Sequence, residues 1–398
     1  MRTTRRATGR VAVTAHTRRA AKALAQELVD DGTLRSTSLR KAVENVPRHI
    51  FVPFYYVQDR TGVWQRHDVR DEYDAAALYR NVTLVTDIDG QGRALSFSSE
   101  PGLSTRMLDM LELEPGHRVL EIGTGTGYTT ALLCELLGDT AVTSIDIAYT
   151  EAARVRLRSL GYTPTLVQGD GFHGVPAHHK YDRIISTVAV PHIPAAWIEQ
   201  LRPGGLLLTD VRRNVTAGNL ALLRHEGRGM LVAGRFVPGR AACMQLRRPA
   251  GEAVPPSCRV DYEVTAEVRR SHTSLNAPVC REPVPWFLAC LSMPTRVTVG
   301  MRYGADYTNA DTPRAVVLTG SDGSWAEVET DARPNGTRRV VQHGPTLLWE
   351  VVESAHALWR AHGRPGWEHL GVSATPTCQH VWLGSPDSDI RWDLPMRV

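Results

Sequence analysis

The sequence predicts a doubly wound α/β sheet that follows N-terminal helices and precedes an appended α+β region. Three observations predict it: a glycine-rich turn between an apolar run and a helical pattern at residues 117–137, strands that alternate with helices over the middle of the chain, and a proline-marked break near residue 250. Strands alternating with helices of this length form parallel sheets. We therefore expect an N-terminal helical segment with an insertion (1–80), an α/β domain (81–250) and a C-terminal α+β domain (251–398).

The first 80 residues carry two amphipathic helix patterns. In residues 18–32 and 36–46, apolar residues recur at intervals of three or four positions, which is the spacing of one helix face. Ser36 or Ser38 can cap the second helix. The stretch VPRHIFVPFYY follows, and its two prolines predict an extended, irregular segment. Residues 58–80 are polar with little periodicity, which predicts a loop-rich insertion.

The middle of the chain reads as alternating elements. The strand pattern NVTLVTDIDG precedes a helix that starts at Pro101, a strand at 119–122 and a helix at 128–137 that Gly138 ends. Further strands and helices are predicted, in order, at 141–147, 150–161, 164–170, 181–190, 195–201 and 204–211. Residues 220–238 read as an antiparallel β-turn-β that closes the sheet edge.

The last part of the chain shows element patterns but no catalytic motif. Residues 315–330 predict a hairpin around Asp322-Gly323, and residues 347–363 predict one amphipathic helix that ends at Gly363. QHVWLGSP is expected to be the final strand. The six tryptophans from Trp325 onwards are expected mostly in the core, so a stabilising or dimerising module is the alternative to a recognition domain.

Composition narrows the function classes. The net charge of +4 over 398 residues is too small to argue for nucleic acid, and no apolar run is long enough to span a bilayer. The basic N-terminus lacks the apolar core of a secretory signal, so we expect a cytoplasmic enzyme and leave the role of this arm open. Six scattered cysteines without C-x-x-C spacing predict no metal site.

The glycine turn suggests a nucleotide-type cofactor. Its residues Gly123, Thr124, Gly125, Gly127 and Tyr128 follow a strand and open a helix. The next strand ends in an aspartate and an isoleucine, and a carboxylate at that place faces the ribose hydroxyls of a bound nucleoside. These two residues are Asp146 and Ile147. NAD and S-adenosylmethionine both need such an acid, so the acid alone does not discriminate.

Three further features favour S-adenosylmethionine over a dinucleotide. The G-x-G-x-G turn is compact and reserves no pyrophosphate cradle, and Glu121 just before it can lie near a cationic cofactor. An aspartate between two glycines can accept from the adenine amino group: Gly169, Asp170 and Gly171. LRPGGLLLTD is a proline-glycine turn into a strand, frequent in methyltransferases. The sheet is then the Rossmann-like sheet of a class I S-adenosylmethionine-dependent methyltransferase.

The methyl acceptor is harder to read. Enzymes that methylate base amino groups grip them with an Asn/Asp-Pro-Pro-aromatic motif after the fourth strand, and this chain has STVAVPHIP there, which disfavours nucleic acid as a partner. His192 lies between two prolines in that segment. It is a general base or a structural residue, and the sequence leaves both readings open.

Four motifs in order carry a family resemblance. VPRHIFVP (46–53), SSEP (98–101), VLEIGTGTGY (119–128) and YDRII (181–185) resemble the landmarks of protein-L-isoaspartate O-methyltransferases over roughly residues 20–248. The resemblance implies that Ser99 contacts the acceptor carboxylate, with Ser98 as its neighbour. The alternative is that these serines only cap the helix after Pro101. A carboxylate is already an anion at neutral pH, so its methylation needs no general base.

The chain also departs from that family. It has ALSFS where repair enzymes have a glycine-glutamine-threonine-isoleucine run, it carries the insertion 58–80, and it continues to residue 398. In these respects it resembles the branch associated with ribosomally made peptides (lanthipeptides, graspetides and lasso peptides). That implies a macrocyclised precursor peptide as partner, one of whose aspartates is methyl-esterified and then closes to a succinimide (aspartimide) that can hydrolyse to isoaspartate.

Two alternatives stay open: an isoaspartate repair enzyme with an added domain, and a methyltransferase-like peptide-binding protein without turnover. The peptide, its macrocycle class, the final product and the oligomeric state do not follow from the sequence.

Overall fold

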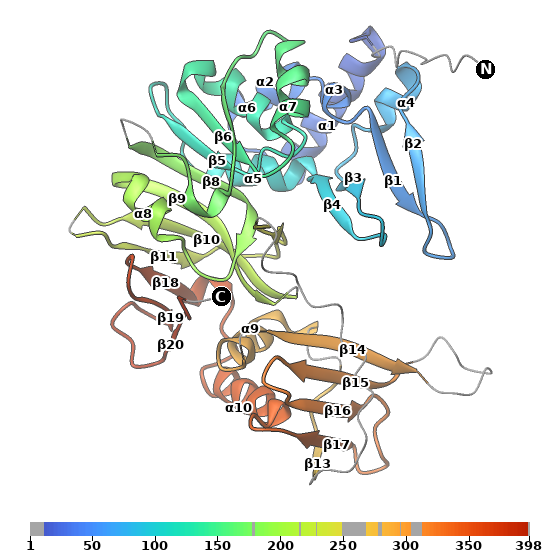
Figure 1. Cartoon of the computed structure of the whole chain (residues 1–398), viewed down its shortest axis with the longest axis vertical. Coiled ribbons are helices and arrows are strands. Elements are labelled where there is room, and N and C mark those ends of the chain that lie inside the picture. The colour runs from blue at the N-terminus through green and yellow to red at the C-terminus, as the bar shows by residue number, and fades with distance from the viewer. Residues whose placement is uncertain are drawn as a thin grey trace. The chain divides into compact units, whose positions relative to one another are not determined.

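A computed structural model describes residues 12–176, 180–214, 216–227, 229–248, 268–277, 281–294, 296–303 and 313–396. The chain forms two compact units (Figure 1). The first comprises Met1–Thr187, Glu199–Leu208 and Leu246–Pro249; the second comprises Val188–Ile198, Thr209–Gln245 and Ala250–Val398. The three sequence segments that we expected to be domains therefore do not coincide with the compact units, because residues 209–245 group with the C-terminal part of the chain.

The first unit begins with helices. α1 (Ala15–Asp30) buries alanines and leucines at helical spacing, and α2 (Thr37–Asn45) is capped by Ser36, whose Oγ accepts from Leu39 N at 3.3 Å. Ser36 is thus confirmed as the cap. The prediction of an irregular segment after α2 was wrong in part, because Arg48–Phe51 form a short helix, α3, directly after Pro47. A proline suits a helix start, where its missing N–H costs nothing.

Residues 54–98 form a four-stranded antiparallel sheet rather than a loop-rich insertion, which corrects the sequence prediction. Its strands are β1 (Phe54–Gln58), β2 (Trp64–Asp68), β3 (Leu84–Ile88) and β4 (Ala94–Ser98), in the order β2-β1-β3-β4, and α4 (Glu72–Ala77) joins the two hairpins.

Both hairpins turn in the same way. Asp59 Oδ1 accepts from Thr61 N and Val63 N, and Asp89 Oδ1 accepts from Gln91 N and Arg93 N. In each turn the fourth residue is a glycine with positive φ, 81° and 76° respectively. The repeated D-x-x-G spacing was therefore the sequence signal for these turns. The strands beside them are polar and partly exposed, so they lack the apolar alternation that would have predicted a sheet.

The α/β part of the first unit follows the sequence closely. After α5 (Pro101–Met110) come β5 (Val119–Ile122), α6 (Tyr128–Leu137), β6 (Val142–Asp146), α7 (Thr150–Arg158), β7 (Thr165–Gln168) and β8 (Tyr181–Val190). The strands pair in parallel in the order β8-β5-β6-β7. The strand at 119–122 and the helix at 128–137 are confirmed at the residues predicted. Parallel pairing brings the carboxyl ends of these strands to one edge.

α8 (Ala195–Gln200) leads into β9 (Leu201–Asn214), and both elements have residues in each of the two units. In the second unit, β10 (Ala217–His225) pairs antiparallel with β11 (Val232–Phe236), as predicted. β11 does not close the sheet edge, however, because β18 (Leu370–Ala374) pairs with it, followed by β19 (Gln379–Leu383) and β20 (Arg391–Asp393). The expected final strand, β19, is thus followed by another. The two-residue β12 (Met244–Gln245) pairs in parallel with β8 at Val188 and Ala189.

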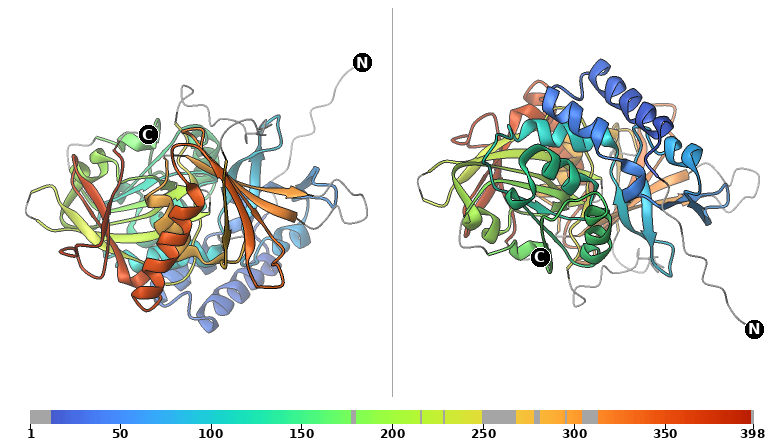
Figure 2. Two further views of the ribbon diagram at one scale, coloured as in Figure 1. Left: turned by 90° about the horizontal axis from the view of Figure 1, so that it is seen from below. Right: turned by 90° about the horizontal axis from the view of Figure 1, so that it is seen from above.

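The rest of the second unit is an antiparallel sheet with two helices (Figure 2). The strands are β13 (Arg269–Thr273), β14 (Val297–Tyr303), β15 (Pro313–Gly320), β16 (Trp325–Glu329) and β17 (Arg338–His343), in the order β13-β17-β16-β15-β14. The helices are α9 (Pro283–Leu291) and α10 (Leu348–Ala361). The hairpin around Asp322-Gly323 and the helix stop at Gly363, whose φ is 78°, are confirmed.

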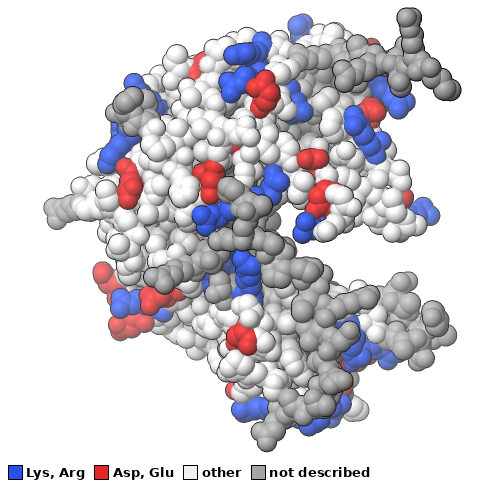
Figure 3. All heavy atoms as spheres, in the orientation of Figure 1, with Lys and Arg blue, Asp and Glu red and all other residues white. Residues whose placement is uncertain are grey.

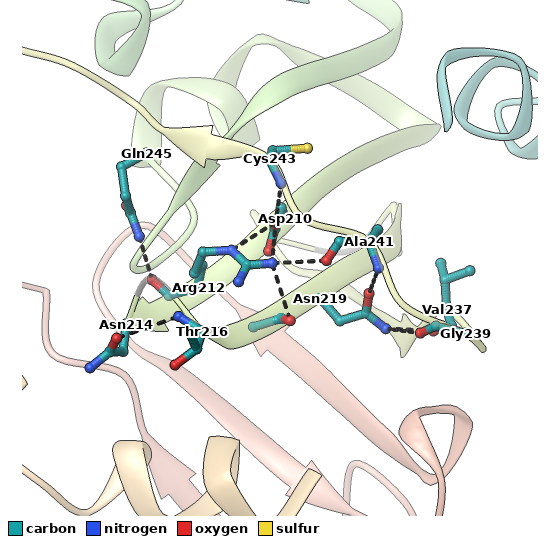
Figure 4. A network of polar contacts seen from close by, with 11 residues as sticks. Asp210, Arg212, Asn214, Thr216, Asn219, Val237, Gly239, Ala241, Cys243 and Gln245 are labelled. Atoms are coloured by element: carbon teal, nitrogen blue, oxygen red, sulfur yellow. Dashed lines mark hydrogen bonds and ion pairs between the residues drawn. The ribbon is translucent and has the colours of Figure 1, made fainter. Parts of the chain in front are cut away.

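A buried polar network holds β9, β10 and the chain that returns along residues 237–245 (Figure 4). Asp210 Oδ2 accepts from Arg212 Nη2 at 2.8 Å and from Cys243 N at 2.9 Å, and Arg212 Nη2 also donates to Ala241 O at 2.9 Å. Asn219 joins the network by donating to the carbonyls of Val237 and Gly239.

Acidic and basic side chains are interspersed on the face that Figure 3 shows. In the part of the chain that the structure describes, no helix combines the length and the apolar character that crossing a bilayer requires.

Candidate cofactor and acceptor site

The glycine turn lies between β5 and α6, at the carboxyl edge of the parallel strands (Figure 1). Gly123, Gly125 and Gly127 have φ of 96°, 50° and 90°, in the left-handed region that favours glycine. A Cβ on Gly127 would approach the Cβ of Ala153 to 3.1 Å, so close packing against α7 also requires a glycine there. The turn is anchored by Gly123 N, which donates to Ile145 O at 2.8 Å.

Asp146 ends β6 and lies beside this turn. Its Oδ2 accepts from Gly125 N at 2.9 Å, and its Oδ1 accepts from Ala148 N at 2.9 Å and Tyr149 N at 3.2 Å. The carboxylate therefore fixes the turn and the start of the next loop at once. The half-buried Ile147 follows it in that loop.

Asp170 stands at the end of β7, between two glycines. A Cβ on Gly171 would lie 2.7 Å from Ile122 Cγ2, so close packing favours glycine there, whereas one on Gly169 would lie 3.4 Å from Ile145 Cδ1, close to an ordinary contact. Asp170 Oδ1 accepts from Phe172 N at 2.9 Å, and its Oδ2 lies 3.3 Å from Arg248 Nε.

Arg248 is a site residue that sequence reasoning missed. Its guanidinium also lies over the Phe172 ring, 4.8 Å from the centroid, and the neighbouring Arg247 lies 5.5 Å from the centroid of Tyr149. Nothing local in the sequence signals this, because the segment returns to the edge of β6 and β7 from more than 70 residues away.

Glu121 is fully buried in β5. Its Oε2 accepts from Thr130 Oγ1 at 2.5 Å and from Ser144 Oγ at 2.6 Å, while Oε1 has no hydrogen-bond partner among the described residues. Burial raises the pKa of this carboxyl to about 7, against the lowering effect of the two hydroxyls. Thr124 joins the same cluster through Ser144 Oγ at 2.6 Å.

Tyr128 opens α6 with its side chain turned into the protein. It is 3% exposed, its ring packs edge-on against Phe51 at 5.9 Å, and burial raises the pKa of its hydroxyl to about 12. The N-cap residue before it, Gly127, has no side chain to cap the helix, and the backbone N–H of Tyr128 donates to Thr126 Oγ1 at 3.5 Å.

Ser98 ends β4 and Ser99 follows it, next to the glycine turn. The carbonyl oxygen of Phe97 lies 3.7 Å from the position that a Cβ on Gly125 would occupy. Ser98 is 2% exposed, and its Oγ has no hydrogen-bond partner among the described residues; Ser99 is half-buried. The N-cap position of α5 is Glu100, which makes no side-chain capping bond, so the reading of the serines as helix caps was wrong.

His192 follows β8 in the second unit and is 3% exposed. The next residue, Ile193, is held at both backbone groups by the side chain of Gln379 in β19, at 2.8 Å to its N and 2.6 Å to its O. The C-terminal strands thus fix the loop that carries this histidine. Both readings of His192 remain predictions.

Comparison with known proteins identifies the family to which the chain is similar. The model of the family described as protein-L-isoaspartate(D-aspartate) O-methyltransferase matches residues 19–235, which is more than half of the chain. The protein-L-isoaspartate O-methyltransferase of Methanothermobacter thermautotrophicus is 37% identical over 193 residues (47% of this chain and 77% of that protein). Protein-L-isoaspartate O-methyltransferase 2 of a Polaromonas species is 35% identical over 196 residues (48% and 81%).

A solved structure of a protein-L-isoaspartate O-methyltransferase has the same fold. It aligns with 92% of this chain and 100% of its own length at a TM-score of 0.52, with 22% identity. The strand, glycine turn and helix that carry the candidate site lie inside the residues that the family model matches. The chain therefore belongs to the protein-L-isoaspartate(D-aspartate) O-methyltransferase family and is an S-adenosylmethionine-dependent methyltransferase.

Proposed function

We propose that this protein methyl-esterifies the side chain of one aspartate in a macrocyclised ribosomal peptide. The observation that carries the proposal is the sheet β2-β1-β3-β4. It ends in Ser98, and its last strand lies against the glycine turn. We assign to this sheet the recognition of the acceptor peptide, because its last strand runs beside the turn proposed to hold the methyl donor.

The residues at the strand ends fit S-adenosylmethionine. Glu121 keeps one buried oxygen without a donor, and no basic side chain in the described residues pairs with it, which suits a cationic ligand. Asp146, beside the turn, would accept hydrogen bonds from the ribose hydroxyls. Asp170, which follows β7, would accept one from the adenine amino group. Bound there, the cofactor supplies a methyl group on a sulfonium, which is electrophilic without further activation.

The acceptor side needs orientation rather than acid–base chemistry. The hydroxyls of Ser98 and Ser99 are assigned to hydrogen-bond one carboxylate oxygen while the other attacks the methyl carbon in line with the carbon–sulfur bond. That bond breaks, its electron pair stays on sulfur, and no proton moves. The Ser98 hydroxyl is buried without a hydrogen-bond partner among the described residues, which costs free energy. A bound acceptor carboxylate would supply the missing acceptor, so this hydroxyl suits the role.

The ester prepares a second reaction that needs no further enzyme group. The backbone nitrogen of the next peptide residue attacks the ester carbonyl, the N–H proton leaves with the methoxy group as methanol, and a succinimide forms. Hydrolysis of the succinimide gives aspartate or isoaspartate. Methyl transfer is therefore the step that selects one aspartate among many.

Selectivity tests the proposal. Every aspartate presents the same reacting group, so discrimination has to come from remote contacts that orient one carboxylate. A preorganised macrocycle loses less entropy in making such contacts than a linear chain. Deletion of residues 251–398 is not a usable test, because β18 pairs with β11 and Gln379 holds the loop at Ile193.

The experiment is methyl transfer from labelled S-adenosylmethionine to three peptides: a candidate precursor in linear form, the same precursor after macrocyclisation, and a generic isoaspartyl hexapeptide. We expect the cyclised peptide to be methylated at one aspartate and the other two to be slower by at least 100-fold. Equal or faster turnover of the isoaspartyl hexapeptide would overturn the tailoring proposal.

Repair of isoaspartate is the second candidate, and the comparisons favour it. The relatives reported above carry that enzyme's name, and the structure of that name aligns with most of this chain, so the C-terminal region does not by itself imply tailoring. A repair enzyme accepts short flexible isoaspartyl peptides, and the hexapeptide arm of the experiment measures this directly. Isothermal calorimetry with S-adenosylhomocysteine tests the remaining alternative, a protein without turnover, since a collapsed pocket would give no heat.

A further inference from the structure

Arg48 is a fully buried cation without an acidic partner among the described residues. It lies in α3, is 0% exposed, and donates to four backbone carbonyls. Its Nη1 reaches Leu78 O at 2.6 Å and Arg80 O at 2.8 Å, while its Nη2 reaches Val82 O at 2.9 Å and Ser99 O at 3.2 Å. Burial lowers its pKa to about 10, so it still carries its charge at neutral pH.

The four carbonyls share a place in the chain. Three belong to the segment 78–82, which precedes β3, and the fourth belongs to Ser99, directly after β4. A single nitrogen, Nη2, therefore joins the start and the end of the β3–β4 hairpin. Two other bonds tie the same stretches, from Glu100 N to Thr83 Oγ1 at 3.2 Å and from Gly102 N to Asn81 Oδ1 at 2.8 Å.

The same short helix also reaches the glycine turn. Phe51, at the end of α3, packs edge-on against Tyr128, the first residue of α6. Burial raises the pKa of the Tyr128 hydroxyl, and the Arg48 charge opposes this with a smaller lowering effect. α3 thus contacts both the residue that follows the cofactor turn and the backbone of Ser99. A displacement of Ser99 by about 1 Å relative to the methyl donor is enough to cost about 100-fold in rate.

We propose that Arg48 is the positioning residue of the acceptor site. It holds the backbone of Ser99 at a fixed distance from the cofactor turn, and its buried charge adds a positive potential where the acceptor carboxylate binds. This rests on the proposed role of Ser99. Burying a guanidinium is costly, and four neutral carbonyls compensate it less well than a carboxylate would. A purely mechanical clamp does not need the charge; a site for an anion benefits from it.

Arg183 provides a matched control. It also donates to backbone carbonyls, those of Leu111, Asp182 and Glu112, and it stands at the other end of α5. It touches no candidate site residue in these contacts. Arg183→Lys therefore reports the cost of weakening a carbonyl clamp in the same unit without disturbing Ser99.

The test is a double-mutant cycle of Arg48→Lys and Ser99→Ala, with labelled S-adenosylmethionine and the acceptor that turns over faster in the selectivity experiment, the cyclised precursor or the isoaspartyl hexapeptide. We expect Ser99→Ala to lower kcat at least 10-fold and Arg48→Lys to lower kcat/KM at least 10-fold, while S-adenosylhomocysteine affinity changes less than 3-fold in both. The double variant should be no slower than the slower single variant, within 3-fold, because both changes remove one function. Arg183→Lys should leave kcat and KM within 2-fold.

Three outcomes separate the possibilities. If the rate loss of the double variant equals the product of the two single losses, Arg48 acts independently of Ser99, and the inference is overturned. Unchanged kinetics in Arg48→Lys, with a loss of thermal stability like that of Arg183→Lys, would reduce Arg48 to a structural clamp and also overturn it. An unaltered rate in Ser99→Ala would instead defeat the proposed acceptor site itself. If Arg48→Lys does not fold, Arg48→Gln, which keeps two donors and loses the charge, carries the same cycle.

Discussion

Two buried carboxylates, one in each unit of the protein, are compensated in different ways. Asp210 in β9 receives two hydrogen bonds from the Arg212 guanidinium, at 2.8 Å and 3.0 Å, and one from the backbone of Cys243. Glu121 in β5 receives only two hydroxyl hydrogen bonds, from Thr130 and Ser144. Burial raises the pKa of both carboxyls. Asp210 thus has its counter-ion within the chain, whereas Glu121 has none among the described residues.

The difference separates a structural charge from one assigned to ligand binding. A buried carboxylate beside a guanidinium holds its own region together and gains nothing from a further cation. A buried carboxylate without a cation destabilises the fold, and a protein that keeps it needs a compensating use. The methyl donor carries a sulfonium and an ammonium group, so its binding would supply the missing positive charge.

The largest effect is expected from Asp210→Ala. The substitution leaves the Arg212 charge buried without its partner, which costs about 3–5 kcal/mol of unfolding free energy. Urea unfolding measures this cost. The paired replacement Asp210→Leu with Arg212→Met removes both charges and should recover most of the stability. If the single substitution is harmless, Asp210 does not hold this region as described.

Glu121→Gln should stabilise the protein at alkaline pH, whereas Asp210→Ala destabilises it. The folded-state pKa of about 7 exceeds the ordinary 4.5, so between these pH values the folded protein keeps a proton that the unfolded chain has lost. Stability therefore falls as pH rises through this window, by up to about 3 kcal/mol, and the loss is complete above it. The variant should be more stable than the parent at pH 8 and equal to it below pH 4.5, while its S-adenosylmethionine affinity falls.

Urea unfolding at pH 5 and pH 8, together with calorimetry of cofactor binding, checks both parts of that prediction. Equal stability of the variant and the parent at pH 8 would show that the carboxyl is not strained in the folded protein. A gain in stability with unchanged cofactor affinity would remove Glu121 from the cofactor site.

Asp146→Ala should weaken S-adenosylmethionine binding by about 1.5–3 kcal/mol for each lost hydrogen bond to a charged acceptor. Asp146 also accepts from three backbone N–H groups, so part of the loss should come from a loosened turn. Asp182→Ala is the control, because Asp182 also accepts from a backbone N–H, that of Arg118, at 2.8 Å. Only the first variant should lose cofactor affinity in a calorimetric titration; equal losses in both would assign the effect to general destabilisation.

The smallest effects are expected from single methyl groups in the glycine turn. Gly127→Ala places a Cβ 3.1 Å from Ala153 at φ 90°, whereas Gly125→Ala meets only an ordinary contact at 3.7 Å and φ 50°. The first should cost about 2 kcal/mol and the second about 1 kcal/mol. Thermal unfolding gives the order of the two, and the reverse order would contradict the packing of this turn against α7.

Sequence reasoning succeeded where local pattern decides structure. Residues 119–122 and 128–137 form a strand and a helix at the residues expected, because an apolar run, a glycine turn and a helix stop are all read within a few residues. Asp146 ends β6 and Asp170 lies two residues after β7, each beside a turn that its own carboxylate stabilises, and their roles toward the cofactor stay predictions.

Sequence reasoning failed where two distant segments complete one another. The strands of residues 54–68 were missed because they are half-exposed and lack the alternation of a buried strand, and β11 was expected to be an edge because its partner β18 arrives more than 130 residues later. Arg48 lies in the motif VPRHIFVP but was given no role from it, and Arg248 stood out neither by spacing nor by its neighbours. Their roles depend on carbonyl and carboxylate groups that only the folded chain brings to them.

The sequence by itself determined the parallel strands, the glycine turn, the family and, with it, the methyl donor, because each depends on backbone conformations and side chains that lie close together in the chain. The tertiary structure decided which buried charges are paired, which strand covers β11, and that Arg48 holds the backbone of Ser99. The physical reason is that burial and hydrogen-bond satisfaction are properties of the surroundings. The residue type alone does not show whether a carboxylate or guanidinium has a partner in the folded protein.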